Sequence, residues 1–369
     1  MTALPTSSRA AVLRQFGEPL RIEDVPVPRE IEPGAILARI ETCSVCGTDV
    51  HLSRGTLSLK VDLPIIIGHE MVGRIVALGS GSDRDSVGNA LRVGDRIVYT
   101  HTACGSCFYC TVARQPTLCD NRKAYMYESM EKPPFLMGGF SEYGYVLPES
   151  GRIRVPDNVP NDLASLCSCA FRSVMNATSQ LGTIAPTDTV AIQGAGPLGL
   201  LAAAVAKVGG AKRVIVIGGP SARLDMALAF GADEVIPVET TSPAERADKV
   251  RELSNGRGAD IVMEFTGHPG AFSEGLEIAR KGGRYLVVGQ LGDAGTEIKP
   301  STIVKKNLQV IGSFSGDAAS YWKALQFVQR HQKTIPFDRM ITGRFRLDEV
   351  NTALERMRKF EEIKPVIEI

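Results

Sequence analysis

The sequence predicts an α/β protein built from two domains, and two observations carry this prediction. From residue 189 onward, apolar strand-like segments alternate with helical segments, which is typical of βαβ units in a doubly wound parallel sheet. Before residue 160 the chain is instead rich in Gly, Pro and β-branched residues, with short strand-like segments between turns. We therefore expect a β-rich domain at 1–171, to which 318–369 returns, and a parallel-sheet domain at 172–317.

The expected elements follow in chain order. In the β-rich region, AILARIETCSVCG, GRIVALG and DRIVYT predict strands, and the polar residues 81–95 predict a surface loop. LASLCSCAFRSVMNATSQL then predicts a helix. TVAIQ predicts a buried strand, PLGLLAAAVAKVGG a helix that ends at glycines, RVIVI a strand and SARLDMALAFGAD a helix. EVIPV, ADIVMEF, GRYLVVG and NLQVIGS continue the strands, and IKPVIEI predicts a last one.

The composition indicates a globular chain without a strongly charged partner. The chain has 369 residues, of which 44% are hydrophobic and 22% charged, and its formal net charge is +1. This balance gives no sign of nucleic-acid or anionic-membrane binding, and no apolar run is long enough to span a bilayer. The N-terminal segment lacks the apolar stretch of a secretory signal, so we expect a cytoplasmic protein.

A glycine-rich turn follows the TVAIQ strand and opens the next helix. In GAGPLG, Gly194 allows the tight turn, Gly196 lets the backbone approach a pyrophosphate, and Gly199 allows close packing of helix and strand. Because the full strand–turn–helix–strand context is present, the motif predicts a dinucleotide site.

The preference between NAD and NADP stays open at this stage. The next strand ends at Gly218, where an acidic residue would bind the ribose hydroxyls of the adenosine, and no acid follows directly. Arg223 is the only cation nearby in the sequence, and it could lie along the adenosine. We slightly favour NAD, because no basic cluster is present.

The eight cysteines all lie between residues 43 and 169, which indicates metal ligands rather than a disulfide scaffold. Four closely spaced thiols can wrap a tetrahedral Zn²⁺ and leave no open position. They therefore predict a structural zinc site, with ligands Cys104, Cys107, Cys110 and Cys119.

Two further segments, CGTDVH and GHE, carry metal-ligand chemistry around Cys46 and His69. A third ligand is needed, and Cys169 in CSCAFRS is the one we favour, although Cys167 lies only two residues away. Three protein ligands with an open fourth position are typical of a catalytic zinc.

Taken together, CGTDVH, GHE, the four-cysteine lobe, GAGPLG and EFTG…GGRYLVVG resemble the zinc-dependent medium-chain alcohol dehydrogenases, in the order of that family. The resemblance implies a GroES-like catalytic domain and a Rossmann domain. It also implies that Cys46, His69 and Cys169 bind the catalytic zinc and that Glu70 is an alternate ligand. Asp49 would orient His69.

The resemblance also implies roles in proton transfer and cofactor binding. Thr48 and His51 would form a proton relay from the alcohol to solvent. The residues that would bind the dinucleotide are the three glycines of the turn together with Pro197, Leu198, Gly218, Arg223, Ser173, Thr266 and Lys364. Leu198 would press on the nicotinamide, Ser173 would line it, and Lys364 would lie near the pyrophosphate.

The expected function is reversible hydride transfer between an alcohol and NAD or NADP, giving a ketone or aldehyde. A secondary alcohol, cyclic or otherwise bulky, is the substrate that we favour, with one catalytic and one structural Zn²⁺ per chain. A polyol or sugar dehydrogenase of the same family, and a non-catalytic zinc- and nucleotide-binding protein, are the alternatives. By resemblance the protein forms a homodimer or homotetramer and has no nucleic-acid or membrane partner.

Overall fold

The computed structural model describes residues 4–57, 60–290, 292 and 294–369, and the chain divides into two compact units. Unit 1 contains the chain up to Arg172 together with Ser315–Gln332 and Phe337–Ile369. Unit 2 contains Ser173–Phe314 and Lys333–Pro336.

Unit 1 is built on two sheets, which confirms the expected β-rich part. A small antiparallel sheet has the order β2-β1-β4, and a larger sheet has the order β15-β16-β3-β5-β6-β8, with β7 also paired to β3. All pairs in the larger sheet are antiparallel except β15 with β16. The strands are β1 (Ser7–Leu13), β2 (Arg21–Pro26), β3 (Ile36–Ser44), β4 (Ile65–Ile66), β5 (Glu70–Leu78), β6 (Arg96–Thr102), β7 (Tyr143–Val146), β8 (Ser150–Arg154), β15 (Arg344–Arg346) and β16 (Val366–Glu368).

The helices of unit 1 have fewer than ten residues each, except α10, which has 14. They are α1 (Gly47–Ser53), α2 (Phe108–Thr111), α3 (Asn161–Leu166), α10 (Ala318–His331) and α11 (Val350–Arg358), with a π-helical turn at Cys167–Phe171 and 3₁₀ turns at Pro116–Leu118, Phe337–Met340 and Leu347–Glu349. The core lies between the two sheets and α11, where alternate strand residues such as Leu13, Ile36 and Ile367 are fully buried. Burying each such side chain contributes about 1.5–3 kcal/mol.

Unit 2 holds a six-stranded sheet with the order β11-β10-β9-β12-β13-β14, and every pair in it is parallel. Its strands are β9 (Thr189–Gln193), β10 (Arg213–Gly218), β11 (Glu234–Pro237), β12 (Ala259–Glu264), β13 (Ala279–Val287) and β14 (Gln309–Gly312). Its helices are α5 (Pro197–Val208), α6 (Ser221–Ala229), α7 (Pro243–Leu253), α8 (Pro269–Ile278) and α9 (Pro300–Lys306), preceded by α4 (Arg172–Leu181), which starts at the last residue of unit 1.

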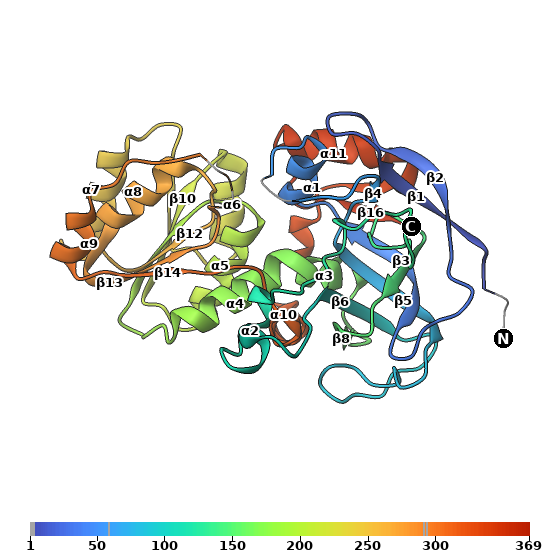
Figure 1. Cartoon of the computed structure of the whole chain (residues 1–369). Coiled ribbons are helices and arrows are strands. Elements are labelled where there is room, and N and C mark those ends of the chain that lie inside the picture. Colours follow the sequence, from blue (N-terminus) through green and yellow to red (C-terminus); the bar gives the residue numbers. More distant parts are fainter. Residues whose placement is uncertain (1–3, 58–59, 291, 293) are drawn as a thin grey trace. The chain divides into compact units, whose positions relative to one another are not determined.

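The strand order explains how the helices cover the sheet of unit 2. The chain moves outward from β9 to β11, returns to β12 and then moves the other way to β14. Because parallel crossovers are right-handed, α5 and α6 lie on one face and α7, α8 and α9 on the other, as Figure 1 shows. The strand order reverses between β9 and β12, the place where such sheets bind ligands beyond their strand ends. The predicted doubly wound parallel sheet is thus confirmed.

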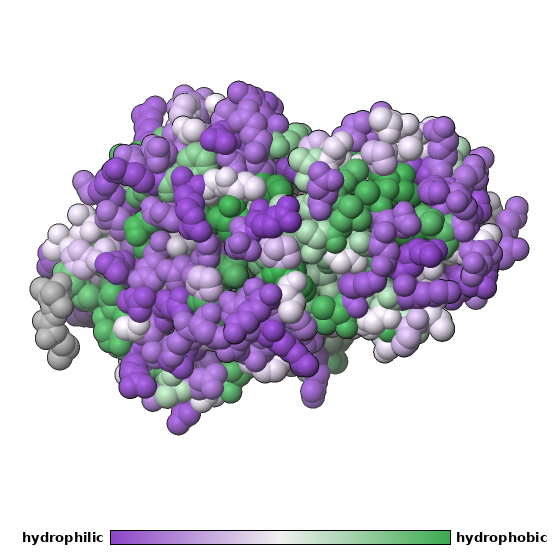
Figure 2. Space-filling model, turned by 180° about the vertical axis from the view of Figure 1, so that it is seen from behind, coloured by the Kyte–Doolittle hydropathy of each residue, from purple (hydrophilic) through white to green (hydrophobic). Residues whose placement is uncertain are grey.

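Polar residues cover most of the face that Figure 2 displays, and apolar residues gather there in separate groups. Within the part of the chain that the structure describes, no helix combines the length and the apolar character that crossing a membrane would need.

Candidate metal and nucleotide sites

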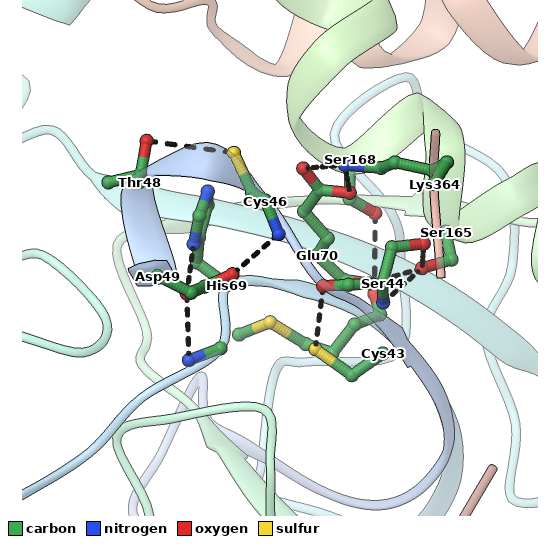
Figure 3. A network of polar contacts seen from close by, with 12 residues as sticks. Cys43, Ser44, Cys46, Thr48, Asp49, His69, Glu70, Ser165, Ser168 and Lys364 are labelled. Atoms are coloured by element: carbon green, nitrogen blue, oxygen red, sulfur yellow. Dashed lines mark hydrogen bonds and ion pairs between the residues drawn. The ribbon is translucent and has the colours of Figure 1, made fainter. Parts of the chain in front are cut away.

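The first part of the metal site forms where β3 runs into α1. Cys46 caps the helix, and its backbone N–H donates to Asp49 Oδ2 at 2.8 Å. Asp49 is fully buried, and its Oδ1 accepts from the backbone N–H of Gly68 and from His69 Nδ1, each at 3.2 Å. One carboxylate therefore ties the helix to the turn before β5 (Figure 3).

The contact with Asp49 decides which nitrogen of His69 can bind a metal. Because Nδ1 donates to the carboxylate, Nε2 is left with its lone pair and can serve as a ligand. The turn that presents His69 contains Gly68 at φ +88°, where a Cβ would lie 2.7 Å from the Phe140 ring. A side chain at that position would therefore clash with Phe140 in the turn that leads to His69.

Cys169 reaches the site from the π-helical turn at Cys167–Phe171. Such turns change the direction of a side chain within a helical segment and are frequent at functional sites. Cys169 is half-buried, whereas Cys167, the alternative ligand, is wholly buried, and burial raises the pKa of its thiol.

The structure brings the four predicted residues of this site together. One ligand atom from each of Cys46, His69, Glu70 and Cys169 lies within 4.8 Å of the others. Cys167 is not part of this group among the described residues. Two sulfurs and an imidazole are soft and borderline ligands that suit Zn²⁺, so the donor set fits the metal that the sequence predicts.

The pKa values of the Cys46 and Cys169 thiols are shifted in opposite directions. The hydrogen bond with Cys169, with burial, raises the pKa of Cys46 to about 12. The same hydrogen bond, donated by Cys46, holds the pKa of Cys169 well below its ordinary value. A thiolate is thus already favoured at Cys169, as metal binding requires.

Glu70 forms a buried ion pair with Lys364. The Lys364 Nζ lies 2.5 Å from both carboxylate oxygens, and both side chains are at most 1% exposed. Burial raises the pKa of Glu70 to about 7, although Lys364 works in the opposite direction. Figure 3 shows Lys364 reaching Glu70 on the side away from Asp49.

Two serines fix the strand that carries Glu70. The Ser165 hydroxyl donates to the backbone oxygen of Glu70 at 2.5 Å and lies 2.6 Å from the Ser44 hydroxyl, and it also accepts from the backbone N–H of Ser44 at 2.9 Å. All three residues are fully buried. This network joins β3, β5 and α3 directly behind the metal-ligand group.

Thr48 and His51, which we expect to form a proton relay, both lie on α1. Thr48 Oγ1 is 3.6 Å from Cys46 Sγ, so the hydroxyl lies beside a metal ligand. His51, one turn later, is exposed, and its Nδ1 lies 3.1 Å from the Thr56 hydroxyl. One group therefore lies at the metal-ligand cluster and the other in contact with solvent.

Aromatic rings form a wall beside His69. The His101 ring stacks on the His69 ring at a centroid distance of 6.4 Å, and Tyr127 lies 6.5 Å beyond it. Burial lowers the pKa of His101 well below its ordinary value, so the ring is neutral. Its Nδ1 accepts from the backbone N–H of Tyr125 at 3.1 Å, which leaves the proton on Nε2.

The four-cysteine lobe forms a second metal-ligand group, with Cys104, Cys107, Cys110 and Cys119 within 4.8 Å of one another. Hydrogen bonds from Asn121 and Ser106 lower the pKa of Cys104 to about 5. The backbone N–H of Cys104 also donates to Cys119 Sγ at 3.2 Å. Four thiols from one loop, one of them already stabilised as a thiolate, fit a closed tetrahedral zinc site.

The glycine turn in unit 2 has the geometry that its sequence predicts. Gly194 has φ +112°, and its N–H donates to the oxygen of Ile217 at 2.8 Å. A Cβ on Gly199 would lie 1.9 Å from the oxygen of Gly194, whereas a Cβ on Gly196 would meet nothing within 4 Å. Space is therefore open only at the glycine that we expect to face the pyrophosphate.

The other residues of unit 2 that we expect to bind the cofactor lie at or near the ends of its helices and strands. Ser173, Pro197 and Leu198 are half-buried at the starts of α4 and α5, and Gly218 ends β10. Arg223 is 8% exposed on α6. Thr266 follows β12, where its N–H and hydroxyl donate to Glu264 Oε1 at 2.7 and 2.8 Å.

Sequence reasoning missed several contacts of the metal site. Lys364 was expected at the pyrophosphate, but its ammonium lies against Glu70, 294 residues away along the chain. No local pattern signals this pairing, or the bonds of Ser165 to Ser44 and Glu70. For the aromatic wall, the sequence offers only the nearness of His101 and Tyr127 to the four-cysteine lobe, which His101 precedes by three residues.

Comparisons with known proteins agree with this geometry. Residues 32–157 match the model of the alcohol dehydrogenase GroES-like domain, and residues 197–330 match that of the zinc-binding dehydrogenases. The chain is 36% identical over 98% of both sequences to 5-exo-hydroxycamphor dehydrogenase of Pseudomonas putida. It is 32% identical over 95% of both to L-threonine 3-dehydrogenase of Bacillus licheniformis.

Among solved structures, an alcohol dehydrogenase of Thermotoga maritima superposes with a TM-score of 0.92 at 35% identity, covering 98% of this chain and 99% of that one. All three proteins are named as dehydrogenases, which contradicts the alternative of a non-catalytic binding protein. The chain belongs to the zinc-dependent medium-chain alcohol dehydrogenase family, whose members are oxidoreductases that act on the CH–OH group of an alcohol.

Proposed function

We propose that the protein oxidises a secondary alcohol, cyclic or otherwise bulky, to a ketone with NAD or NADP, and that it also catalyses the reverse reaction. The observation that carries this proposal is the convergence of Cys46, His69 and Cys169 in one group, with Asp49 holding Nδ1 of the histidine. Three ligands leave the fourth position of a tetrahedral metal open for the substrate.

The catalytic step needs a Lewis acid, a hydride acceptor and a way out for one proton. When bound, zinc polarises the alcohol oxygen and the nicotinamide takes the hydride from its carbon. The Thr48 hydroxyl, beside Cys46 Sγ, accepts the alcohol proton, and His51, exposed on the same helix, delivers it to solvent.

Glu70 is the alternate metal ligand in this proposal. Its carboxylate belongs to the same group of ligand atoms, and Lys364 holds both of its oxygens. The ion pair keeps the carboxylate from acting as a permanent fourth ligand, which leaves the open position to the substrate. The four-cysteine lobe holds a second, structural zinc, so that each chain carries two.

The aromatic wall supports an apolar substrate skeleton. His101 and Tyr127 present ring surface beside His69, and the polar groups of these two rings are limited to the His101 Nε2–H and the Tyr127 hydroxyl. A polyol would leave several hydroxyls facing this surface without partners, and each such hydroxyl would weaken binding. The relative named for hydroxycamphor, a compact cyclic alcohol, supports the same choice.

Cofactor and assembly complete the proposal. Residues 172–317 form the nucleotide-binding domain, with the glycine turn at the pyrophosphate, and residues 1–171 with 318–369 form the catalytic domain. The protein forms a homodimer or homotetramer through β14, which among the described strands pairs only with β13 and has Val310 39% exposed. We place the protein in the cytoplasm, whose reducing conditions keep the eight cysteines out of disulfides and so available as zinc ligands.

The test compares Cys169→Ala with Cys167→Ala, assayed by absorbance of the reduced nicotinamide over a panel of cyclic alcohols, linear alcohols, threonine and a polyol. We expect wild type to contain two zinc ions per chain, Cys169→Ala to lose one zinc and turnover, and Cys167→Ala to keep both. Full turnover in Cys169→Ala would refute the metal mechanism. Turnover of polyols alone would refute the proposed substrate class.

A further inference from the structure

The end of β10 lacks the acidic residue that normally selects the adenosine ribose in a dinucleotide-binding sheet. Gly218 and Gly219 stand there instead, and the next residues supply no carboxylate. From the sequence alone, this position leaves the choice between a free 2′-hydroxyl and a 2′-phosphate undecided.

The tertiary structure brings a carboxylate to this position from the neighbouring strand. Gly218 pairs with Pro237, the last residue of β11, and the N–H of Val238 donates to the oxygen of Gly218 at 2.9 Å. Val238 thus continues alongside β10 for one more residue, and Glu239 follows it. A Cβ on Gly219 would lie 2.1 Å from Glu239 Oε1 and 2.7 Å from Oε2, so the carboxylate occupies the space that a side chain there would fill.

The same strand end touches the glycine turn. A Cβ on Gly218 would lie 2.8 Å from both the N and the Cβ of Ala195, the second residue of GAGPLG. Gly218 therefore contacts the glycine turn at the expected pyrophosphate site. The Glu239 carboxylate lies beside the next residue of the chain, Gly219. The adenosine ribose extends in this direction from a pyrophosphate at the start of α5.

We propose that Glu239, supplied by β11 in place of the missing acid of β10, accepts the hydroxyls of the adenosine ribose and selects NAD over NADP. This inference rests on the proposed function, since it needs a dinucleotide at the glycine turn. A carboxylate there accepts hydrogen bonds from the 2′- and 3′-hydroxyls, and it repels a 2′-phosphate.

The cation nearby does not reverse this selection. Arg223, on α6, is only 8% exposed, whereas Glu239 is exposed. A ligand that arrives from solvent therefore meets the carboxylate before the guanidinium. A side chain at position 219 would take the space of the Glu239 carboxylate and move it from this place.

The experiment measures the dissociation constants of NADH and NADPH by fluorescence titration of the full-length protein. Wild type should bind NADH more tightly, and Glu239→Gln should lower the NADPH constant about tenfold and raise the NADH constant a few-fold. Glu239→Lys should move the ratio of the two constants further in the same direction. The control is Glu234→Gln, which removes the same charge at the opposite end of β11 and should change the ratio by less than about twofold.

Three results would count against the inference. Tighter binding of NADPH by wild type, or an unchanged ratio in both Glu239 variants, would overturn it while leaving the proposed dehydrogenase function intact. Binding of neither dinucleotide by wild type would overturn the proposed function and this inference with it. The melting temperatures of the Glu239 variants should equal that of wild type, because the substituted side chain is exposed. Equal values show that the fold is kept.

Discussion

Asp49→Asn tests how strongly one carboxylate holds the metal site together. Asp49 accepts three hydrogen bonds, from the N–H groups of Cys46 and Gly68 and from His69 Nδ1. An amide offers one oxygen and one NH₂ group. In its better orientation, the oxygen keeps the bonds to Gly68 and His69, and the NH₂ group faces the N–H of Cys46.

The size of the effect follows from this mismatch. Two buried donors, the Cys46 N–H and the new amide, lose their acceptors, and each costs roughly 1–3 kcal/mol. We therefore expect the free energy of unfolding to fall by about 2–6 kcal/mol. The loss of a carboxylate behind a ligating histidine should also weaken zinc binding about 10- to 100-fold.

The assay combines zinc affinity, measured by competition with a chelator, and unfolding in urea. Asp62→Asn is the matched control, because Asp62 is 55% exposed and pairs with Lys132 on the surface. Its unfolding free energy should change by less than about 1 kcal/mol. If Asp49→Asn kept both wild-type zinc affinity and wild-type stability, the role of Asp49 in orienting His69 would be refuted.

The other predictions concern the glycine turn, the cysteine lobe and acid stability. Gly199→Ala should lower the melting temperature and abolish dinucleotide binding, because its Cβ would lie 1.9 Å from a backbone oxygen of the turn. Gly196→Ala should keep the melting temperature and lose only dinucleotide binding. Equal melting temperatures of the two variants in calorimetry would contradict this difference. Cys104→Ser should remove one of two zinc ions, as counted by elemental analysis, and make the lobe sensitive to protease; a full zinc count with an intact lobe would show that this thiol is not a ligand. Hydrogen bonds from Arg74 and Asn161 outweigh burial and keep the pKa of Glu41 below its usual 4.5. The carboxylate therefore stabilises the fold above pH 4.5, and this contribution is lost as the pH falls through the lower folded-state pKa. Glu41→Gln should therefore lose less stability in acid than wild type does. Parallel acid-unfolding curves of the two proteins would disprove the role of Glu41.

The sequence by itself determined what depends on local pattern. Strand and helix periodicity predicted the doubly wound sheet, because a parallel strand that is buried on both faces has a nearly continuous apolar run, as in the centre of TVAIQ and in the last four residues of RVIVI. Spacing predicted the four-cysteine group, since ligands close in sequence can meet around one ion. The order of GAGPLG after a strand predicted the turn whose Gly194 has φ +112°.

Only the tertiary structure decided the contacts made across the fold. Lys364 meets Glu70 because β16 pairs with β3, and β3 in turn with β5. Glu239 meets Gly219 because β11 lies beside β10. A charged side chain carries no periodicity that names its partner, and strand pairing between distant segments depends on the packing of the whole sheet. The elements could therefore be predicted from the sequence, whereas the charged groups beside the metal-ligand cluster and beside Gly219 could not.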